Sequence, residues 1–141
     1  MKRIDILIPG DKLREVREAI KKSGAGGFLI ISGKGQGKGE RPSVGGGRGT
    51  ARYVAEYNSI ESIMTIVDDS KVNAVVSAVL EATSTGSKGD GKIFVTSVED
   101  AYDIGTKQKG TSAIYTPLSF FKMSSTNSSI VLSTGKTLNG M

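Results

Sequence analysis

Residues 62–98 read SIMTIVDDSKVNAVVSAVLEATSTGSKGDGKIFVTSV, and they predict a strand, a helix and a second strand in succession. The runs 62–67 and 92–98 are rich in β-branched and aromatic residues, which is typical of strands. Between these runs, apolar residues recur at helical spacing after Asp68, which is placed to cap a helix, and Gly86 is a plausible stop. The segment therefore reads as one β-α-β unit.

The first part of the chain repeats this plan. Strands are predicted over 3–8 and 27–32, with a helix between them that Asp11 is placed to cap and Gly24 to end. Two such units predict an α+β fold, a ferredoxin-like βαββαβ sandwich of four antiparallel strands with two helices on one face.

Two further expectations concern the sheet. Residues 50–57 alternate in polarity, and we expect them to form a hairpin with 60–67. The sheet face without helices needs cover from other subunits, and we expect it to carry Ile4, Ile6, Ile8 and Phe94 or its neighbours.

Composition excludes several kinds of chemistry. The chain has 141 residues with no His and no Cys, so Ser-His and Cys-His catalysis, thiol redox chemistry and Cys/His zinc sites are absent. We predict no catalytic residues and no protein-held metal. The apolar runs are far shorter than the roughly 20 residues of a spanning helix, and the start of the chain does not resemble a signal peptide. We therefore expect a cytoplasmic protein without stable membrane insertion.

A basic, glycine-rich segment interrupts the predicted fold. Residues 33–49 contain eight glycines, and residues 33–52 carry five basic residues and one acid. Loops of this length in small domains are usually functional or disordered, and the charge favours an anionic partner. Nucleic-acid binding is one alternative, although only Tyr53 and Tyr57 lie near the basic residues and no aromatic RNA-binding pattern is present.

A second glycine-rich segment favours phosphate binding. Gly86-x4-Gly91-Lys92 lies between a predicted helix and a strand, which is the reverse of the order in a Walker A loop. Gly89 and Gly91 can expose successive backbone N–H groups, and Lys88 and Lys92 add positive charge. The alternative is a simple glycine-rich turn that enters a strand.

Three segments of the chain resemble the PII signal-transduction family of nitrogen regulators. They are TGSKGDGKIFVTSVEDA (85–101), VDDSKVNAVVSAVLEA (67–82) and MKRIDILIPGDKLREVREAI (1–20). The resemblance implies a compact homotrimer over residues 1–114, with a long T-loop at about 33–58. It implies ATP or ADP in clefts between subunits, with Mg possible beside ATP. It also implies a non-enzymatic regulator that docks its T-loop on an ammonium transporter or a nitrogen-assimilation enzyme. Residues 115–141 are then a Ser/Thr-rich C-terminal extension.

The resemblance also gives roles to individual residues. Tyr53 falls at a position that some bacterial members modify. The implied nucleotide-binding residues lie at the T-loop base, in the strand 62–67 and in the loop before the last strand: Gly35, Gly37, Lys38, Met64, Thr65, Ile66, Gly86, Ser87, Lys88, Gly89, Asp90, Gly91 and Lys92.

Three departures from the family pattern make 2-oxoglutarate binding doubtful. Gly39 stands where the family has a Gln, Ile60 where it has a Lys, and Asp103-Ile-Gly105 where it has Arg-x-Arg. Asp103, which replaces the first Arg of that motif, is expected to repel a triphosphate. A PII-like sensor of another small anion or nucleotide is therefore an alternative. The sequence identifies neither the target nor the second ligand.

Overall fold

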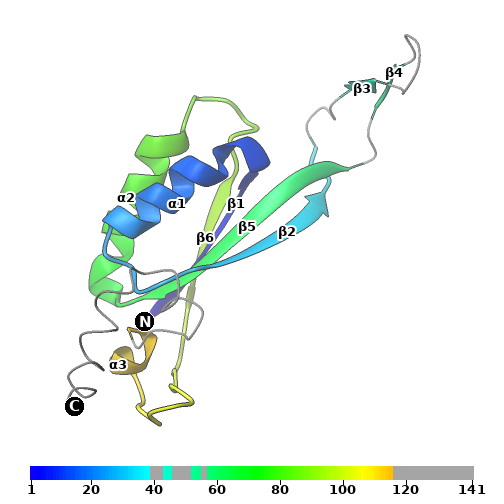
Figure 1. The fold of residues 1–141 in the computed structure, drawn as a ribbon. Coiled ribbons are helices and arrows are strands. Elements are labelled where there is room, and N and C mark those ends of the chain that lie inside the picture. Colours follow the sequence, from blue (N-terminus) through cyan, green and yellow to red (C-terminus); the bar gives the residue numbers. More distant parts are fainter. Residues whose placement is uncertain (39–42, 46–51, 55–56, 116–141) are drawn as a thin grey trace, which may run out of the picture. The chain divides into compact units, whose positions relative to one another are not determined.

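The structure is a computed structural model of the chain that describes residues 1–38, 43–45, 52–54 and 57–115, with only the backbone for 43–45 and 52–54. It divides into two units, Met1–Glu99 and Asp100–Met141, each of which is treated by itself. Figure 1 shows the elements of the first unit as a sheet with two helices beside it.

Four strands form the main sheet of the first unit, and every neighbouring pair is antiparallel. The strand order is β2-β5-β1-β6, so β2 and β6 are the edges. The strands are β1 (Lys2–Pro9), β2 (Leu29–Gly35), β5 (Asn58–Val67) and β6 (Lys92–Ser97). The predicted α+β ferredoxin-like fold is confirmed.

Two helices connect the strands. The helix α1 (Leu13–Lys22) follows a short 3-10 turn η1 (Gly10–Lys12), and α2 (Val72–Thr83) follows η2 (Asp69–Lys71). Asp68 caps η2, because its carboxylate accepts from the N–H of Ser70 at 3.1 Å. Asp11 lies inside η1 and caps nothing, so that detail of the prediction is wrong. Gly24 follows α1 with φ +87°, a conformation that favours glycine and ends the helix.

The isoleucines of β1 face the helices, so the prediction that they lie on the open face is wrong. Ile4, Ile6 and Ile8 are buried in the core with Val16 and Val79 of the helices. Residues paired across strands share a face, and Ile6 pairs with residues Ile63 and Ile93. The alternate residues of β1, which include the charged Arg3 and Asp5, therefore point to the other side.

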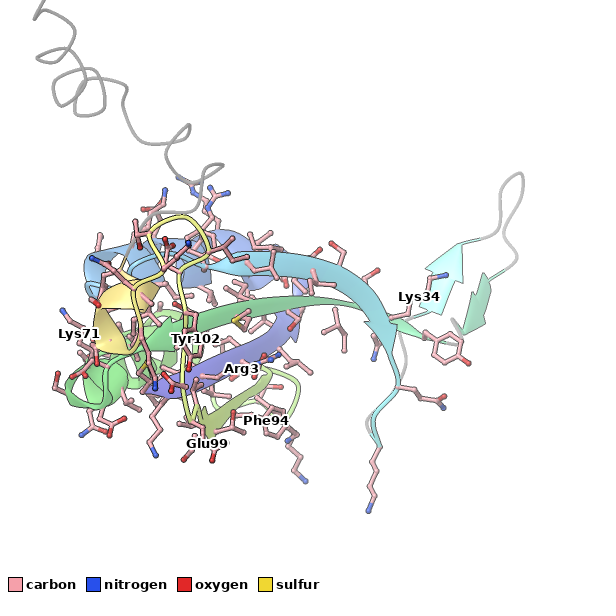
Figure 2. The ribbon with its side chains drawn as sticks, turned by 90° about the horizontal axis from the view of Figure 1, so that it is seen from below. Arg3, Lys34, Lys71, Phe94, Glu99 and Tyr102 are labelled. Atoms are coloured by element: carbon pink, nitrogen blue, oxygen red, sulfur yellow. The ribbon has the colours of Figure 1, made fainter. Side chains whose placement is uncertain are left out.

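The face without helices is largely apolar around one ion pair. Arg3 and Asp5 bond through Nε and Oδ2 at 2.9 Å. Figure 2 labels Arg3 and, on the neighbouring strand β6, Phe94. By the register, this open face also carries Leu7, Leu29, Ile31, Met64, Ile66 and Phe94. Three of these side chains are well exposed in the single chain, namely Leu29, Ile31 and Phe94.

The predicted hairpin between 50–57 and 60–67 is wrong in its partners. β4 (Arg52–Val54) pairs with β3 (Ser43–Gly45), a short strand inside the glycine-rich segment. In the main sheet β5 instead pairs with β1 on one side and with β2 on the other, the latter from Leu29↔Met64 to Gly35↔Asn58.

The second unit is described up to Tyr115. A turn at residues 103–107 brings Tyr102 and Lys109 together in an isolated antiparallel bridge. Lys109 pairs with Asp100 at 3.3 Å and lies over the Tyr102 ring. A short helix, α3 (Thr111–Ile114), follows. The predicted extension lies outside the described residues from 116 onward.

Candidate functional site

The loop between α2 and β6 is held tightly against β1. Gly91 has φ +126°, and a β-carbon there would run into the carbonyl oxygen of Leu7 and lie 3.0 Å from Cγ2 of Ile8. Only glycine allows this backbone to approach so closely in that conformation. The contact fixes where β6 begins, directly before Lys92.

Asp90 ties the loop together from within. Its Oδ2 accepts from the backbone N–H of Thr85 at 2.6 Å and of Ser87 at 3.2 Å, and its Oδ1 accepts from the Thr85 hydroxyl at 2.6 Å. The hydroxyl and N–H of Thr85, then the N–H of Ser87 and the charge of Lys12, hold the pKa of Asp90 below its usual value. The N–H of Gly89 donates to Ser87 Oγ at 3.2 Å. The N–H groups of Ser87 and Gly89 are thus already engaged within the loop.

Thr85 was missed by sequence reasoning. Both of its donors bind Asp90, so it closes the loop five residues before that carboxylate. The available signal was a Thr directly before the glycine-rich run, since short hydroxyl side chains often bond nearby groups in turns.

Lys92 belongs to the open face of the sheet. It pairs with Leu7, and Leu7 pairs with Ser62, so the three residues form one row across neighbouring strands. Its side chain is exposed. The loop is therefore followed by a positive charge at the edge of the open face, which also carries the Arg3–Asp5 ion pair.

The three residues of strand β5 that are expected to bind the base of the nucleotide do not lie on one face of the sheet. Met64 and Ile66 lie on the open face, whereas Thr65 is buried on the helix side at 1% exposure. The Thr65 hydroxyl donates to the carbonyl of Gly27 at 2.5 Å. Within one chain, Met64 and Ile66 are available to a ligand on the open face. Thr65 instead stabilises the chain just before β2 from the helix side of the sheet.

The two glycine-rich parts of the candidate site lie on opposite edges of the sheet. Gly35 ends β2 at one edge, and Gly37 and Lys38 follow it, whereas the loop that carries Gly86 to Gly91 precedes β6 at the other edge. Three strand spacings separate β2 from β6, roughly 14 Å. In Figure 2, Lys34 near the end of β2 lies well away from Phe94 on β6.

A cavity of about 530 Å³ lies on the helix side of the same loop. Its walls come from α2, β1 and β6, and the loop residues Ser87 and Asp90 border it. It lies on the opposite side of the sheet from Met64. Gly86, Gly91 and Lys92 also border it.

Asp103 in the second unit is held by its own turn. Its Oδ2 accepts from the N–H and the hydroxyl of Thr106, both at 2.8 Å. These bonds, the backbone one first, lower the pKa of the Asp103 carboxyl, so it stays charged. Whether it repels a triphosphate stays a prediction.

The described ranges, 1–38, 43–45, 52–54 and 57–115, hold no group of three or more Asp, Glu, His or Cys arranged to bind a metal ion. They also hold no helix with the length and apolar character needed to cross a membrane.

Comparison with known proteins gives one consistent result. The profile of the family described as "Nitrogen regulatory protein P-II" matches residues 1–108. A nitrogen regulatory protein P-II from Azospirillum brasilense is 39% identical over 116 residues, which cover 81% of this chain and all of the relative. Proteins of the same description from Rhodospirillum rubrum and Porphyra purpurea are each 36% identical, with the same shares covered.

Proposed function

We propose, from the premise that the chain belongs to the nitrogen regulatory protein P-II family, that it senses adenine nucleotides and passes that signal to a target protein. Family membership places the chain in nitrogen regulation and signal transduction. The ligand, the assembly and the target are the subject of the proposal.

One observation carries the nucleotide proposal: the Thr85–Lys92 loop is preformed and presents Lys92 at the start of β6. Gly91 packs on the Leu7 carbonyl, and Asp90 closes the loop, so little order has to be created on binding. Lys88 and Lys92 then supply positive charge for the phosphates of ATP or ADP. Magnesium would be held by the phosphates of ATP, since no protein cluster for it is found among the described residues.

A homotrimer is part of the proposal, because the open face needs cover. Exposed Leu29, Ile31 and Phe94 on a four-stranded sheet make an apolar surface that single proteins rarely leave in water. A site that contains both Gly35 and Lys92 also needs a second chain or a T-loop that folds back, since these residues lie on opposite sheet edges. Clefts between subunits satisfy both requirements.

The T-loop, at about 33–58, is proposed to dock on the target. The strands β3 and β4 pair within it, which gives it a hairpin to present. An ammonium transporter or a nitrogen-assimilation enzyme is the proposed class of partner. Tyr53, in β4, is the proposed modification position. We propose a cytoplasmic regulator without enzymatic activity of its own, whose domain ends near residue 114 and whose extension is 115–141.

Calorimetry with ADP and ATP tests the ligand. Lys92→Ala is expected to weaken binding about tenfold or more, since a charge-assisted contact contributes roughly 1.5–3 kcal/mol. Lys22→Ala, an exposed lysine at the end of α1, is the matched control and should bind like the wild type. Unchanged binding by Lys92→Ala would show that the site lies elsewhere. Salt-sensitive binding of single-stranded RNA, without nucleotide binding, would favour the nucleic-acid alternative.

Light scattering tests the assembly. Ile31→Lys places a charge on the open face and is expected to reduce the trimer to smaller species. Glu18→Lys on the exposed side of α1 controls for the change in charge. A wild-type monomer at micromolar concentration would remove the proposed intersubunit cleft.

A further inference from the structure

Asp90 uses its carboxylate inside its own loop. Both oxygens are engaged, by two donors of Thr85 and by the N–H of Ser87. The N–H of Asp90 in turn donates to the Ser87 carbonyl at 3.3 Å. The six residues from Thr85 to Asp90 are therefore closed into one hydrogen-bonded ring.

The carboxylate takes the place that an external anion would otherwise occupy. Backbone N–H groups that converge in a glycine-rich loop bind phosphate when they are free. Here the N–H groups of Thr85 and Ser87 converge on Asp90 instead. A phosphate could use these two donors only by displacing a bonded carboxylate of like charge. The groups that bind a phosphate must therefore be others, above all lysine side chains.

The ring is connected to Lys92 through one residue. Asp90 precedes Gly91, whose backbone lies against the carbonyl of Leu7, and Lys92 then pairs with Leu7. Fixing Asp90 therefore fixes where the main chain enters β6 and where the Lys92 side chain begins. If the ring opens, Lys92 has to be ordered anew each time a ligand binds, which costs conformational entropy.

We propose that Asp90 is a positioning residue, which holds the Thr85–Gly91 loop in the shape that presents Lys92 and does not itself contact the nucleotide. This inference rests on the nucleotide-binding function proposed above. It changes the role that the family resemblance gives Asp90, from a ligand contact to a part of the loop's own support.

Three variants test the ring. Asp90→Ala removes both carboxylate oxygens on which the donors of Thr85 and Ser87 converge. Thr85→Val removes one donor and leaves the backbone N–H in place. Asp68→Ala is the matched control, because Asp68 caps η2 through the N–H and hydroxyl of Ser70 in the same manner, outside the loop.

Amide hydrogen exchange measured by NMR reports the ring without any ligand. The Thr85 and Ser87 amides should be protected in the wild type and in Asp68→Ala, and should lose that protection in Asp90→Ala. Rapid exchange of both amides in the wild type would overturn the ring, whatever the chain binds.

Calorimetry then separates positioning from contact. Asp90→Ala is expected to weaken ADP binding about tenfold, and Thr85→Val to weaken it less, whereas Asp68→Ala should lose stability but keep its affinity. In a Lys92→Ala background, Asp90→Ala should have little further effect, because its influence acts through Lys92. The loss should be equal for metal-free ADP and for ATP with magnesium.

Contrary outcomes are distinct. Additive losses from Asp90→Ala and Lys92→Ala, or a loss confined to magnesium-ATP, would show that Asp90 contacts the ligand or its metal and would overturn the proposal. Full affinity in Asp90→Ala after amide protection is lost would do the same. A wild type that binds no nucleotide overturns the proposed function itself, and the first titration reveals it before any variant is made.

Discussion

The side chain of Ile60 on β5 lies over Gly35 at the end of β2. A β-carbon on Gly35 would lie 2.5 Å from Cδ1 of Ile60 and 3.3 Å from its Cγ1. Both residues belong to the open face, where the main sheet gives way to the T-loop. The base of the T-loop is therefore packed by an aliphatic side chain, and the glycine beneath it leaves room for that packing.

Gly35→Ala is expected to destabilise the chain by about 0.5–1.5 kcal/mol, because the terminal Cδ1 of Ile60 must turn away from its preferred rotamer to make room for the new methyl group. Gly33→Ala is the control, because it lies on the same strand and its β-carbon would meet nothing within 4 Å. Ile60→Val removes the Cδ1 atom and should recover part of the loss in the Gly35→Ala background. Urea unfolding of the four proteins measures this, and equal stability of Gly33→Ala and Gly35→Ala would contradict the packing.

Gly91→Ala should be the more damaging substitution. The new methyl group would meet a backbone carbonyl, which cannot rotate away, and the residue has φ +126°. Strain of this kind costs about 1–3 kcal/mol before the clash is counted. We expect a lower midpoint of thermal unfolding together with weaker ADP binding.

Gly89→Ala provides the comparison for Gly91→Ala, because its β-carbon would lie 3.8 Å from Ser87 Oγ, an ordinary contact. Its midpoint of thermal unfolding should stay close to that of the wild type. If Gly91→Ala behaves like Gly89→Ala, the approach of the loop to β1 is not as close as described.

The order of the main elements could be predicted from the sequence, but the choice of face could not. Alternation along β1 separates Ile4, Ile6 and Ile8 from Arg3 and Asp5, without saying which set the helices cover. The charged residues indicate which set is covered, because Arg3 and Asp5 can pair at an exposed or subunit surface but not beneath two apolar helix faces.

Strand partners were harder to predict because short strands carry weak patterns. The alternation in 50–57 is real, yet its partner β3 contains only three residues, Ser43–Gly45, in a run dominated by glycine. Nothing in composition favours a strand there. The strand β3 therefore forms because it pairs with β4, and the sequence of residues 43–45 alone does not predict it.

The candidate site was predictable in its glycines and lysines, but not in its hydrogen bonds. The pattern Gly86-x4-Gly91-Lys92 indicated either a phosphate-binding loop or a glycine-rich turn that enters a strand, and the structure has a glycine-rich loop there, packed against β1. The pattern could not show that Thr85 and Asp90 use each other's polar groups, since this depends on side-chain conformations within the closed loop.

Acid should open the loop before it unfolds the sheet. The pKa of Asp90 is lowered in the folded chain, first by the Thr85 hydroxyl, so its contribution to stability is present above the unfolded value of about 3.9 and is lost as the pH falls through the folded pKa. Exchange protection of the Thr85 and Ser87 amides should disappear in that range. Asp90→Asn should show no such transition, and an identical pH profile in both proteins would refute this prediction.

The final prediction is that 2-oxoglutarate binds poorly or not at all. The site implied by the family resemblance needs magnesium on ATP phosphates, a Gln at the T-loop base and a Lys that faces the distal carboxylate. This chain has Gly39, which lies outside the described residues, and Ile60, whose side chain is committed to packing over Gly35. An aliphatic group there would leave a carboxylate desolvated without a partner, which is the costly case for a buried charge.

Titration with millimolar 2-oxoglutarate in saturating magnesium-ATP should therefore give no saturable heat with the wild type. Ile60→Lys combined with Gly39→Gln should produce measurable binding, whereas Ile60→Leu with the same Gly39→Gln should not, because only lysine supplies a charge that pairs with the ligand. A micromolar constant for the wild type would instead mean that another residue completes the site. Gln36 is the nearest amide in the sequence, and Gln36→Ala should then abolish the binding.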